Sequence, residues 1–163
     1  HYQIEDAYCN PGPVQEPNPP IMVGGAGEEV TLKLVAKRAD AWNLGGPLDS
    51  YAHKVDVIRN HCETVGRDFE EIELTYDGHV VCTRDRDKLD RMLDRIGPED
   101  VTEWDDVDDV DELATVIGTP EECAEQVEKL VDLGVTRFQF WFSDYPDMEG
   151  LELFADEVVP EFR

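Results

Sequence analysis

Hydrophobic residues along this chain follow two spacings: short runs or alternations typical of strands, and three-to-four-residue repeats typical of helices. The unbroken apolar run Ile21-Met22-Val23 predicts a buried parallel strand, and Ala41-Trp42-Asn43-Leu44 predicts a second. β-Branched and aromatic residues over 72–81 predict a third strand, with a bulge at Asp77-Gly78. Alternation predicts a fourth over Val135–Phe142. Its aromatic side, Phe138, Phe140 and Phe142, is expected to face helices, and its other side, Arg137, Gln139 and Trp141, a polar interior.

Each predicted strand is followed by residues with helical spacing. The expected helices are Glu28–Ala39, 49–65, 87–96, 119–134 and 148–159. The first would bury Val30, Leu34, Val35 and Ala39. Gly66 is a typical helix stop, and Thr119-Pro120-Glu121-Glu122 combines an N-cap, a proline at the first helical position and a reciprocal glutamate. Cys123, Val127, Leu130 and Val131 form the expected buried stripe of that helix.

Strand and helix therefore alternate about four times, which predicts an α/β fold. We expect one partial domain over 1–163, with an extended proline-rich connector at 1–18 and four βα units over 19–163. Four βα units are half of an eight-stranded barrel, although a doubly wound open sheet fits the same pattern. The acidic stretch 101–116, which contains Trp104, is expected to be a surface excursion.

The first predicted strand runs directly into glycines and then into a helix. Gly24, Gly25 and Gly27 permit positive φ and close approach of a ligand, and the first N–H groups of a helix at Glu28 would point toward an anion. The sequence thus predicts a phosphate-binding turn formed by Gly24, Gly25, Ala26, Gly27 and Glu28. Glycines that merely tighten a strand-to-helix turn are the alternative.

Charge narrows the function classes. The 163 residues carry 39 acidic and 14 basic side chains, a formal net charge of −25, which disfavours a nucleic-acid partner and favours a salt-rich cytoplasm that screens self-repulsion. No apolar stretch is long enough to cross a membrane and no signal sequence precedes the first element, so a cytoplasmic location is expected. The four cysteines have no metal-binding spacing and are expected to be reduced, mostly buried thiols.

Several motifs occur together in an order that resembles the luciferase-like monooxygenase superfamily, and most closely its deazaflavin-dependent oxidoreductases. They are Pro19-Pro20-Ile21-Met22-Val23-Gly24-Gly25-Ala26-Gly27-Glu28, Ala39-Asp40-Ala41-Trp42-Asn43, Val65-Gly66-Arg67-Asp68, Ile117-Gly118-Thr119-Pro120-Glu121-Glu122 and Gly134-Val135-Thr136-Arg137-Phe138-Gln139-Phe140-Trp141-Phe142. Family members are eight-stranded β/α barrels about twice this length, so the resemblance implies that the chain is the C-terminal half of such a barrel.

The resemblance also implies a cofactor, coenzyme F420 or alternatively FMN, which exchanges a hydride with a small organic substrate. Its phosphate end would lie at the glycine-rich turn, and Trp42 and Asn43 would lie near it at the end of the second strand. Trp42 as a core residue is an equal alternative. The family's usual acid and base side chains lie in the other half, so the catalytic residues are left unassigned.

Further residues are candidates for the substrate end of the pocket or for a metal site. His79 is a possible proton donor or a structural histidine, and Gln139, Trp141 and Ser143 are candidates to line the substrate end of the pocket. The acidic residues Asp105, Asp106, Asp108 and Asp109 lack the spacing of a calcium loop, so no metal is expected. A non-catalytic half-barrel that binds a phosphorylated ligand is the competing function. Exposed sheet edges would favour a homo-oligomer or pairing with an N-terminal half-barrel.

Overall fold

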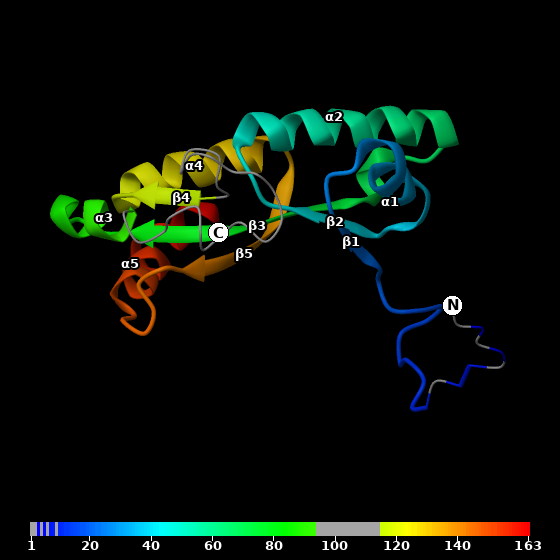
Figure 1. The fold of residues 1–163 in the computed structure, drawn as a ribbon, viewed down its shortest axis with the longest axis horizontal. Helices are drawn as coiled ribbons and strands as arrows, with labels where there is room; N and C mark the ends of the chain where they lie inside the picture. The colour runs from blue at the N-terminus through cyan, green and yellow to red at the C-terminus, as the bar shows by residue number, and fades with distance from the viewer. Residues whose placement is uncertain (1–2, 4, 6, 9, 94–114) are drawn as a thin grey trace.

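The computed structural model describes residues 3, 5, 7, 8, 10–93 and 115–163, and it is a parallel sheet with helices packed along it (Figure 1). The strands are β1 Met22–Gly24, β2 Ala41–Leu44, β3 Glu73–Cys82, β4 Thr115–Gly118 and β5 Val135–Phe142. The helices are α1 Lys33–Arg38, α2 Leu48–Val65, α3 Arg86–Leu93, α4 Pro120–Asp132 and α5 Glu149–Glu157. Short helical turns are η1 Glu28–Leu32, η2 Phe69–Glu71 and η5 Val159–Phe162. The predicted α/β class is confirmed, and the architecture is consistent with a partial barrel.

β3 organises the sheet because it pairs with three other strands. Its first half pairs with β2, which in turn pairs with β1, and its last four residues, His79–Cys82, pair with β4. β5 pairs with Leu74–Val80, and this stretch overlaps both sets of partners, so β5 lies on the opposite edge of β3. All four pairings are parallel. The order β1-β2-β3-β5 is therefore the predicted four-strand series, with β4 added beside the end of β3.

The core lies between the sheet and the helices. One cluster joins α1 and α2 to β2 and β3, and its largest buried side chains are Trp42 and Tyr51. A second cluster joins α4 and α5 to β3, β4 and β5 and centres on Phe154, which makes edge contacts with Phe140 and Phe142. Phe138, Phe140 and Phe142 thus face the helices, as predicted. Arg137, Gln139 and Trp141 are exposed on the other face.

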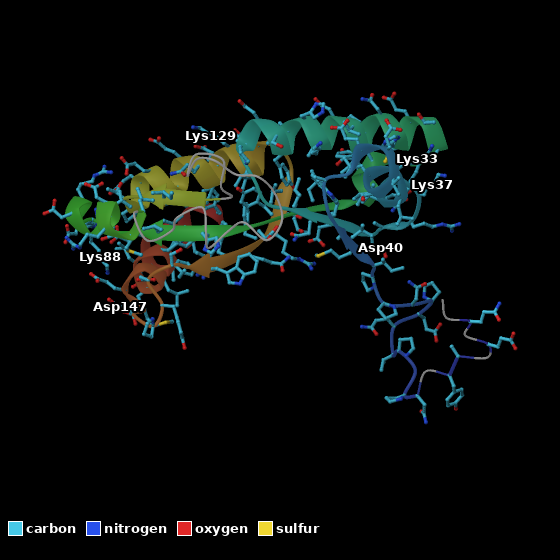
Figure 2. All side chains as sticks on the ribbon, viewed as in Figure 1. Lys33, Lys37, Asp40, Lys88, Lys129 and Asp147 are labelled. Carbon is cyan, nitrogen blue, oxygen red and sulfur yellow. The ribbon has the colours of Figure 1, made fainter. Side chains whose placement is uncertain are left out.

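The helix predicted at Glu28–Ala39 has a different start and phase. It opens with the π-helical turn η1, in which the Leu32 N–H donates to the Gly27 carbonyl at 2.9 Å, and it becomes α-helical only at Lys33. The wider turn rotates later side chains, so Leu32 and Ala36 are buried together with Val35 and Ala39. Val30 and Leu34, which were expected inside, are 77% and 48% exposed. Lys33 and Lys37 of α1 are also exposed (Figure 2).

Other local predictions need correction. The run Ile21-Met22-Val23 is not covered on both faces, because β1 is an edge strand in this chain and Ile21 and Met22 are 49% and 40% exposed. Thr115 and Val116 belong to β4 rather than to a surface excursion. Val131, which was expected in the buried stripe of α4, is 40% exposed, whereas Ala124, which was not, is buried. The sheet irregularity falls between Leu74 and Thr75, not at Asp77-Gly78.

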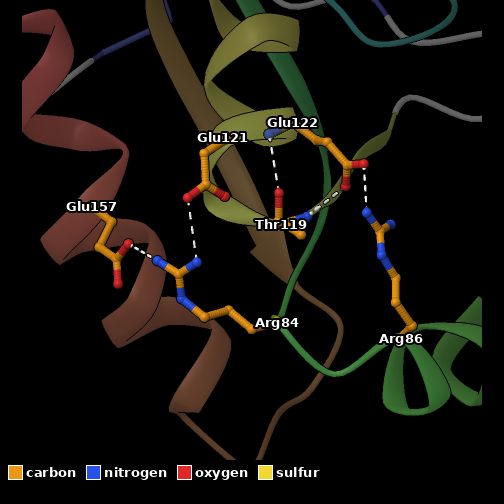
Figure 3. Close-up of polar contacts among 6 residues, drawn as sticks. All are labelled: Arg84, Arg86, Thr119, Glu121, Glu122 and Glu157. Atoms are coloured by element: carbon orange, nitrogen blue, oxygen red, sulfur yellow. Dashed lines mark hydrogen bonds and ion pairs between the residues drawn. The ribbon is translucent and has the colours of Figure 1, made fainter.

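Helix α4 begins as predicted, and its start is tied to neighbouring segments by ion pairs (Figure 3). The Thr119 hydroxyl accepts from the Glu122 N–H at 3.4 Å, and the Glu122 carboxylate accepts from the Thr119 N–H at 2.8 Å. Glu122 also pairs with Arg86 at 2.6 Å, while Arg84 pairs with both Glu121 and Glu157. These contacts fasten the segment after β3 to α4 and α5.

Three of the predicted cysteine states are confirmed, since Cys62, Cys82 and Cys123 are free and buried. Cys9 lies outside the described residues, as do residues 94–114 with Trp104, Asp105, Asp106, Asp108 and Asp109. Within the described part of the chain, no helix is long and apolar enough to cross a membrane. In the same part, no cluster of three or more His, Cys, Asp or Glu side chains is arranged to hold a metal ion.

Candidate functional site

The glycine-rich turn is fixed by backbone bonds from β2. Gly25 has φ of 122°, its N–H donates to the Asn43 carbonyl at 3.3 Å, and its own carbonyl accepts from the Trp42 indole N–H at 3.0 Å. No acceptor among the described residues pairs with the N–H of Ala26 or of Gly27. Gly24 and Gly27 are exposed. The turn therefore offers accessible backbone donors of the kind that a phosphate group accepts.

Two of the three glycines also have a packing reason. A Cβ on Gly25 would lie 3.3 Å from the Thr31 methyl carbon, in addition to the strain of its positive φ. A Cβ on Gly27 would lie 3.1 Å from the Thr31 hydroxyl. Gly24 has only an ordinary contact, with a Cβ 3.7 Å from the Asn43 carbonyl oxygen. The tight turn thus accounts for Gly25 and Gly27 without a ligand, while the N–H groups that lack an acceptor among the described residues suit one.

Glu28 connects the turn to α2. Its carboxylate accepts from Lys54 Nζ at 2.6 Å and lies 3.0 Å from His53 Nε2, and its carbonyl oxygen lies 2.9 Å from His61 Nε2. The Lys54 and His53 hydrogen bonds lower the pKa of Glu28. A carboxylate would repel a phosphate, but here its charge is balanced by Lys54 and its side chain is turned to α2. The carboxylate of Glu28 therefore does not face the turn as an unpaired negative charge.

Trp42 and Asn43 of β2, both predicted to lie near the cofactor, point to opposite faces of the sheet. Trp42 is fully buried, stacks with its centroid 5.0 Å from that of Tyr51, and holds the Gly25 carbonyl, so it supports the turn from behind and offers no surface to a ligand. The core alternative for Trp42 is the one that its position supports. Asn43, the next residue along the strand, points to the opposite face and is only partly buried.

Asn43 is the centre of a polar network on this open face of the sheet. Its Nδ2 donates to Asp77 Oδ1 at 3.0 Å. Its Oδ1 lies 2.6 Å from the Thr75 hydroxyl and 3.4 Å from Gln139 Nε2. The three strands bring these side chains together because Asn43 is in register with Thr75 and Asp77 with Gln139. Burial raises the pKa of Asp77, and the Asn43 hydrogen bond opposes that rise.

A second group lies further along the same face. His79 Nδ1 lies 3.3 Å from the Ser143 hydroxyl, and the His79 ring centroid lies 5.9 Å from that of Trp141, which is 56% exposed. The predicted residues Gln139, Trp141 and Ser143 therefore lie on one face with His79. Sequence inspection missed Thr75 and Asp77, although the alternation of Thr75, Asp77 and His79 with the apolar Leu74, Tyr76 and Val80 marks one polar side of β3.

A parallel sheet with helices on one face, polar side chains on the other and a glycine-rich turn after an edge strand is consistent with a partial β/α barrel. Residues 1–137 match the model of the luciferase-like monooxygenase family, and the chain belongs to that family.

Solved structures show the same fold at low sequence identity. The coenzyme F420-dependent tetrahydromethanopterin reductase from Methanopyrus kandleri is 21% identical, with a TM-score of 0.66 over 88% of this chain and 51% of its own. An F420-dependent secondary alcohol dehydrogenase, in complex with an F420-acetone adduct, is 17% identical, with a TM-score of 0.75 over 100% of this chain and 54% of its own. The FMN-bound oxygenating constituent of 3,6-diketocamphane monooxygenase from Pseudomonas putida is 19% identical, with a TM-score of 0.61 over 88% and 49%. The chain spans about half the length of these neighbours.

Proposed function

We propose that this chain is the C-terminal half of an oxidoreductase barrel that binds coenzyme F420, or FMN in its place, and acts on a small organic substrate. The observation that carries the proposal is the accessible glycine-rich turn at the edge of a face lined by polar side chains. Its N–H groups on Ala26 and Gly27 have no acceptor among the residues that the structure describes. When bound, the deazaflavin or flavin ring supplies the hydride chemistry. The chain would hold the phosphate end at the turn and orient the substrate with Asn43, Asp77 and Gln139.

We expect the chain to bind the deazaflavin in about 2 M potassium chloride, and a fluorescence titration with coenzyme F420 measures this. Gly25→Asp should abolish saturable binding, because the new side chain meets Thr31, strains a φ of 122° and adds a negative charge beside the phosphate. Gly12→Asp adds the same charge in the connector, where a Cβ meets nothing within 4 Å, and should bind like the parent chain.

Binding that survives in Gly25→Asp would refute the turn as the phosphate site. If the folded parent chain does not bind, the same titration on a longer chain with four more βα units separates two explanations. Binding there would assign the requirement to the other half of the barrel, and no binding there would refute the cofactor proposal.

We also propose that a second half-barrel, or a second copy of this chain, covers the exposed edges. Beside β1, Ile21, Met22, Val30 and Leu34 leave apolar surface open. On the other edge, a groove of about 410 Å³ runs along the helix-facing side of β5, lined by Phe138, Phe140, Phe142, Phe154 and Phe162 among others. A non-catalytic half-barrel that binds a phosphorylated ligand is the second candidate, because the N–H groups of the turn suit any phosphate group and do not require a deazaflavin or flavin.

Salt should stabilise this protein. Even if every one of the 14 basic side chains paired with an acid, 39 − 14 = 25 negative charges would remain unbalanced. The ion pairs in Figure 3 are surface pairs that contribute little to stability. Salt therefore removes less stability by screening these pairs than it adds by screening the repulsion among the excess negative charges.

We expect the midpoint of thermal unfolding to rise by roughly 5–10 °C between about 0.1 M and about 2 M potassium chloride. Circular dichroism measures the midpoint, and a sucrose series controls for general solute effects. A midpoint that stays flat or falls with salt would contradict the proposed adaptation to a salt-rich cytoplasm.

A further inference from the structure

The Thr75 hydroxyl has more acceptor partners than it can satisfy. Its Oγ1 lies 3.1 Å from the Trp42 carbonyl oxygen and 2.6 Å from Asn43 Oδ1, and the side chain is fully buried. A hydroxyl carries one proton, so it donates to only one of these two oxygens at a time. With Asn43 Oδ1 as the acceptor, the Trp42 carbonyl receives nothing from Thr75.

Rotation of the Asn43 side-chain amide by a half-turn gives the Thr75 hydroxyl a donor and leaves it one acceptor, but it brings two acceptor oxygens together at Asp77. It places Nδ2 toward Thr75, so that Nδ2 donates to the hydroxyl and the hydroxyl donates to the Trp42 carbonyl. The same half-turn places the Asn43 carbonyl oxygen about where Nδ2 was, 3.0 Å from Asp77 Oδ1. Two acceptor oxygens at that distance repel unless a proton lies between them. The turned state therefore requires a protonated Asp77, and the two states of the network differ by one proton.

The protonation state of Asp77 also determines which end of the Gln139 amide faces the surface. With Asp77 ionised, Gln139 Nε2 points inward to Asn43 Oδ1 at 3.4 Å, and its carbonyl oxygen is left to face outward. With Asp77 protonated, Asn43 offers its second Nδ2 proton, so Gln139 turns its carbonyl inward and its NH2 group outward. Gln139 is exposed, so water can hydrogen-bond the outward group in either orientation of its amide.

We propose that the group Asn43, Thr75, Asp77 and Gln139 is a proton-coupled recognition site for a ligand oxygen, in which the charge of Asp77 decides whether Gln139 presents an acceptor or a donor. The ionised state suits a hydroxyl group that donates, and the protonated state suits a carbonyl group that only accepts. This inference rests on the proposed function, in which a small organic substrate lies against the same face. Asp77 and Asn43 are positioning residues in this scheme.

The surroundings allow Asp77 to hold a proton. Burial raises its pKa, while the Asn43 hydrogen bond and the charge of His79 on the same strand lower it. Tyr76, beside it on β3, has its pKa raised to about 12, chiefly by burial, and burial also raises the pKa of Tyr51 on α2. Both tyrosines therefore stay neutral. The strand neighbour on β5 is Gln139, which is uncharged, and Arg137 on β5 is paired with Glu73 at 2.8 Å.

The test is a pH titration of this chain by NMR, which requires no cofactor. We expect the Asp77 carboxyl carbon and the side-chain amide signals of Asn43 and Gln139 to change with one shared midpoint. Gln126 is an internal control, because its Nε2 is held by the carbonyl oxygens of Ile117 and Glu122, both at 2.8 Å, and its signals should not follow that midpoint. Amide signals of Asn43 that stay constant through the Asp77 titration would overturn the proposal.

Variants of Thr75 test the direction in which the shared midpoint shifts. The protonated state uses two bonds of the Thr75 hydroxyl and the ionised state uses one, so Thr75→Val should lower the shared midpoint. Thr75→Ser keeps the hydroxyl and should restore the midpoint. An unchanged or raised midpoint in Thr75→Val contradicts the two-state network.

Acetone is the probe for the ligand, since its oxygen accepts and does not donate. Its contact with the Gln139 amide, seen as signal shifts, should appear only below the midpoint. Equal shifts on both sides of the midpoint, or none, would overturn the recognition role. Because no cofactor is present, failure here is distinguishable from failure of the coenzyme F420 titration.

Discussion

Trp42→Ala is expected to lower the free energy of unfolding by about 4–5 kcal/mol, the upper range for truncation of a buried aromatic side chain. Trp42 has no exposed surface, it stacks on Tyr51, and its indole N–H is bonded to the Gly25 carbonyl at 3.0 Å. The substitution thus leaves a cavity in the first core cluster and frees the turn. A domain is stable by only about 5–15 kcal/mol, so a loss of this size is a large fraction of the total stability. Urea unfolding followed by circular dichroism measures the loss.

Trp42→Phe is the matched control. It keeps most of the ring packing and removes the indole N–H, so we expect a loss of about 1–2 kcal/mol. Equal losses in the two variants would show that the hydrogen bond to the turn, and not the packing volume, is what Trp42 contributes. A loss below about 1 kcal/mol in Trp42→Ala would contradict the buried position itself.

Gly118→Ala is expected to destabilise the chain by about 3 kcal/mol, from a strained backbone and a lost helix cap together. Gly118 has φ of 141°, and an added Cβ would collide with the Glu122 carboxylate and lie 2.7 Å from the Glu122 Cβ. Glu122 would have to leave the Thr119 N–H, which it accepts at 2.8 Å, and Arg86. Both contacts are seen in Figure 3. Urea unfolding in the same buffer measures the effect.

Gly24→Ala is the comparison for this substitution. Gly24 is not among the glycines with positive φ, and a Cβ there would lie 3.7 Å from the Asn43 carbonyl oxygen. We expect a change of no more than about 0.5 kcal/mol. Similar losses in the two variants would mean that general strand effects, rather than the crowding against Glu122, set the energy at Gly118.

Sequence patterns predicted the helices and strands correctly wherever neighbouring residues determine the local geometry. Two helix ends depend only on residues that are close together in the chain. They are the start of α4, capped by Thr119 and Glu122, and the end of α2 at Gly66, whose φ is 73°. The alternation in β5 separated Phe140 from Gln139 correctly, because the two faces of a strand meet different surroundings.

The errors arose where geometry depends on distant contacts. The π-helical turn η1 has no sequence signature and moved Val30 and Leu34 to the surface. β4 is only four residues long and is stabilised by its pairing with His79–Cys82, which no local pattern reveals. Ile21 is exposed for another reason. An apolar run predicts that both faces of a strand are buried, but it does not show whether the same chain or another chain buries them.

At the site, the sequence located the turn and Asn43, but not the partners that surround them. Thr75 and Asp77 are ordinary strand residues by type, and only the register of β2, β3 and β5 brings them to Asn43 and Gln139. Lys54, which balances the Glu28 carboxylate, is 26 positions further along the chain. Such pairs follow from the tertiary fold, so inspection of neighbouring residues did not find them.

The position of β4 bears on how this fold can change during evolution. β2 pairs with the first part of β3 only as far as Tyr76, and β4 covers the same edge from His79 onward. The crossover between β3 and α4 therefore contributes a strand without displacing any member of the order β1-β2-β3-β5. The pairing with β4 begins at His79, beyond the Asn43 partners Thr75 and Asp77, so the Asn43 network does not use the strand that the crossover contributes. A variant of the crossover that keeps β3 and α4 in place is therefore expected to leave the open face of the sheet intact.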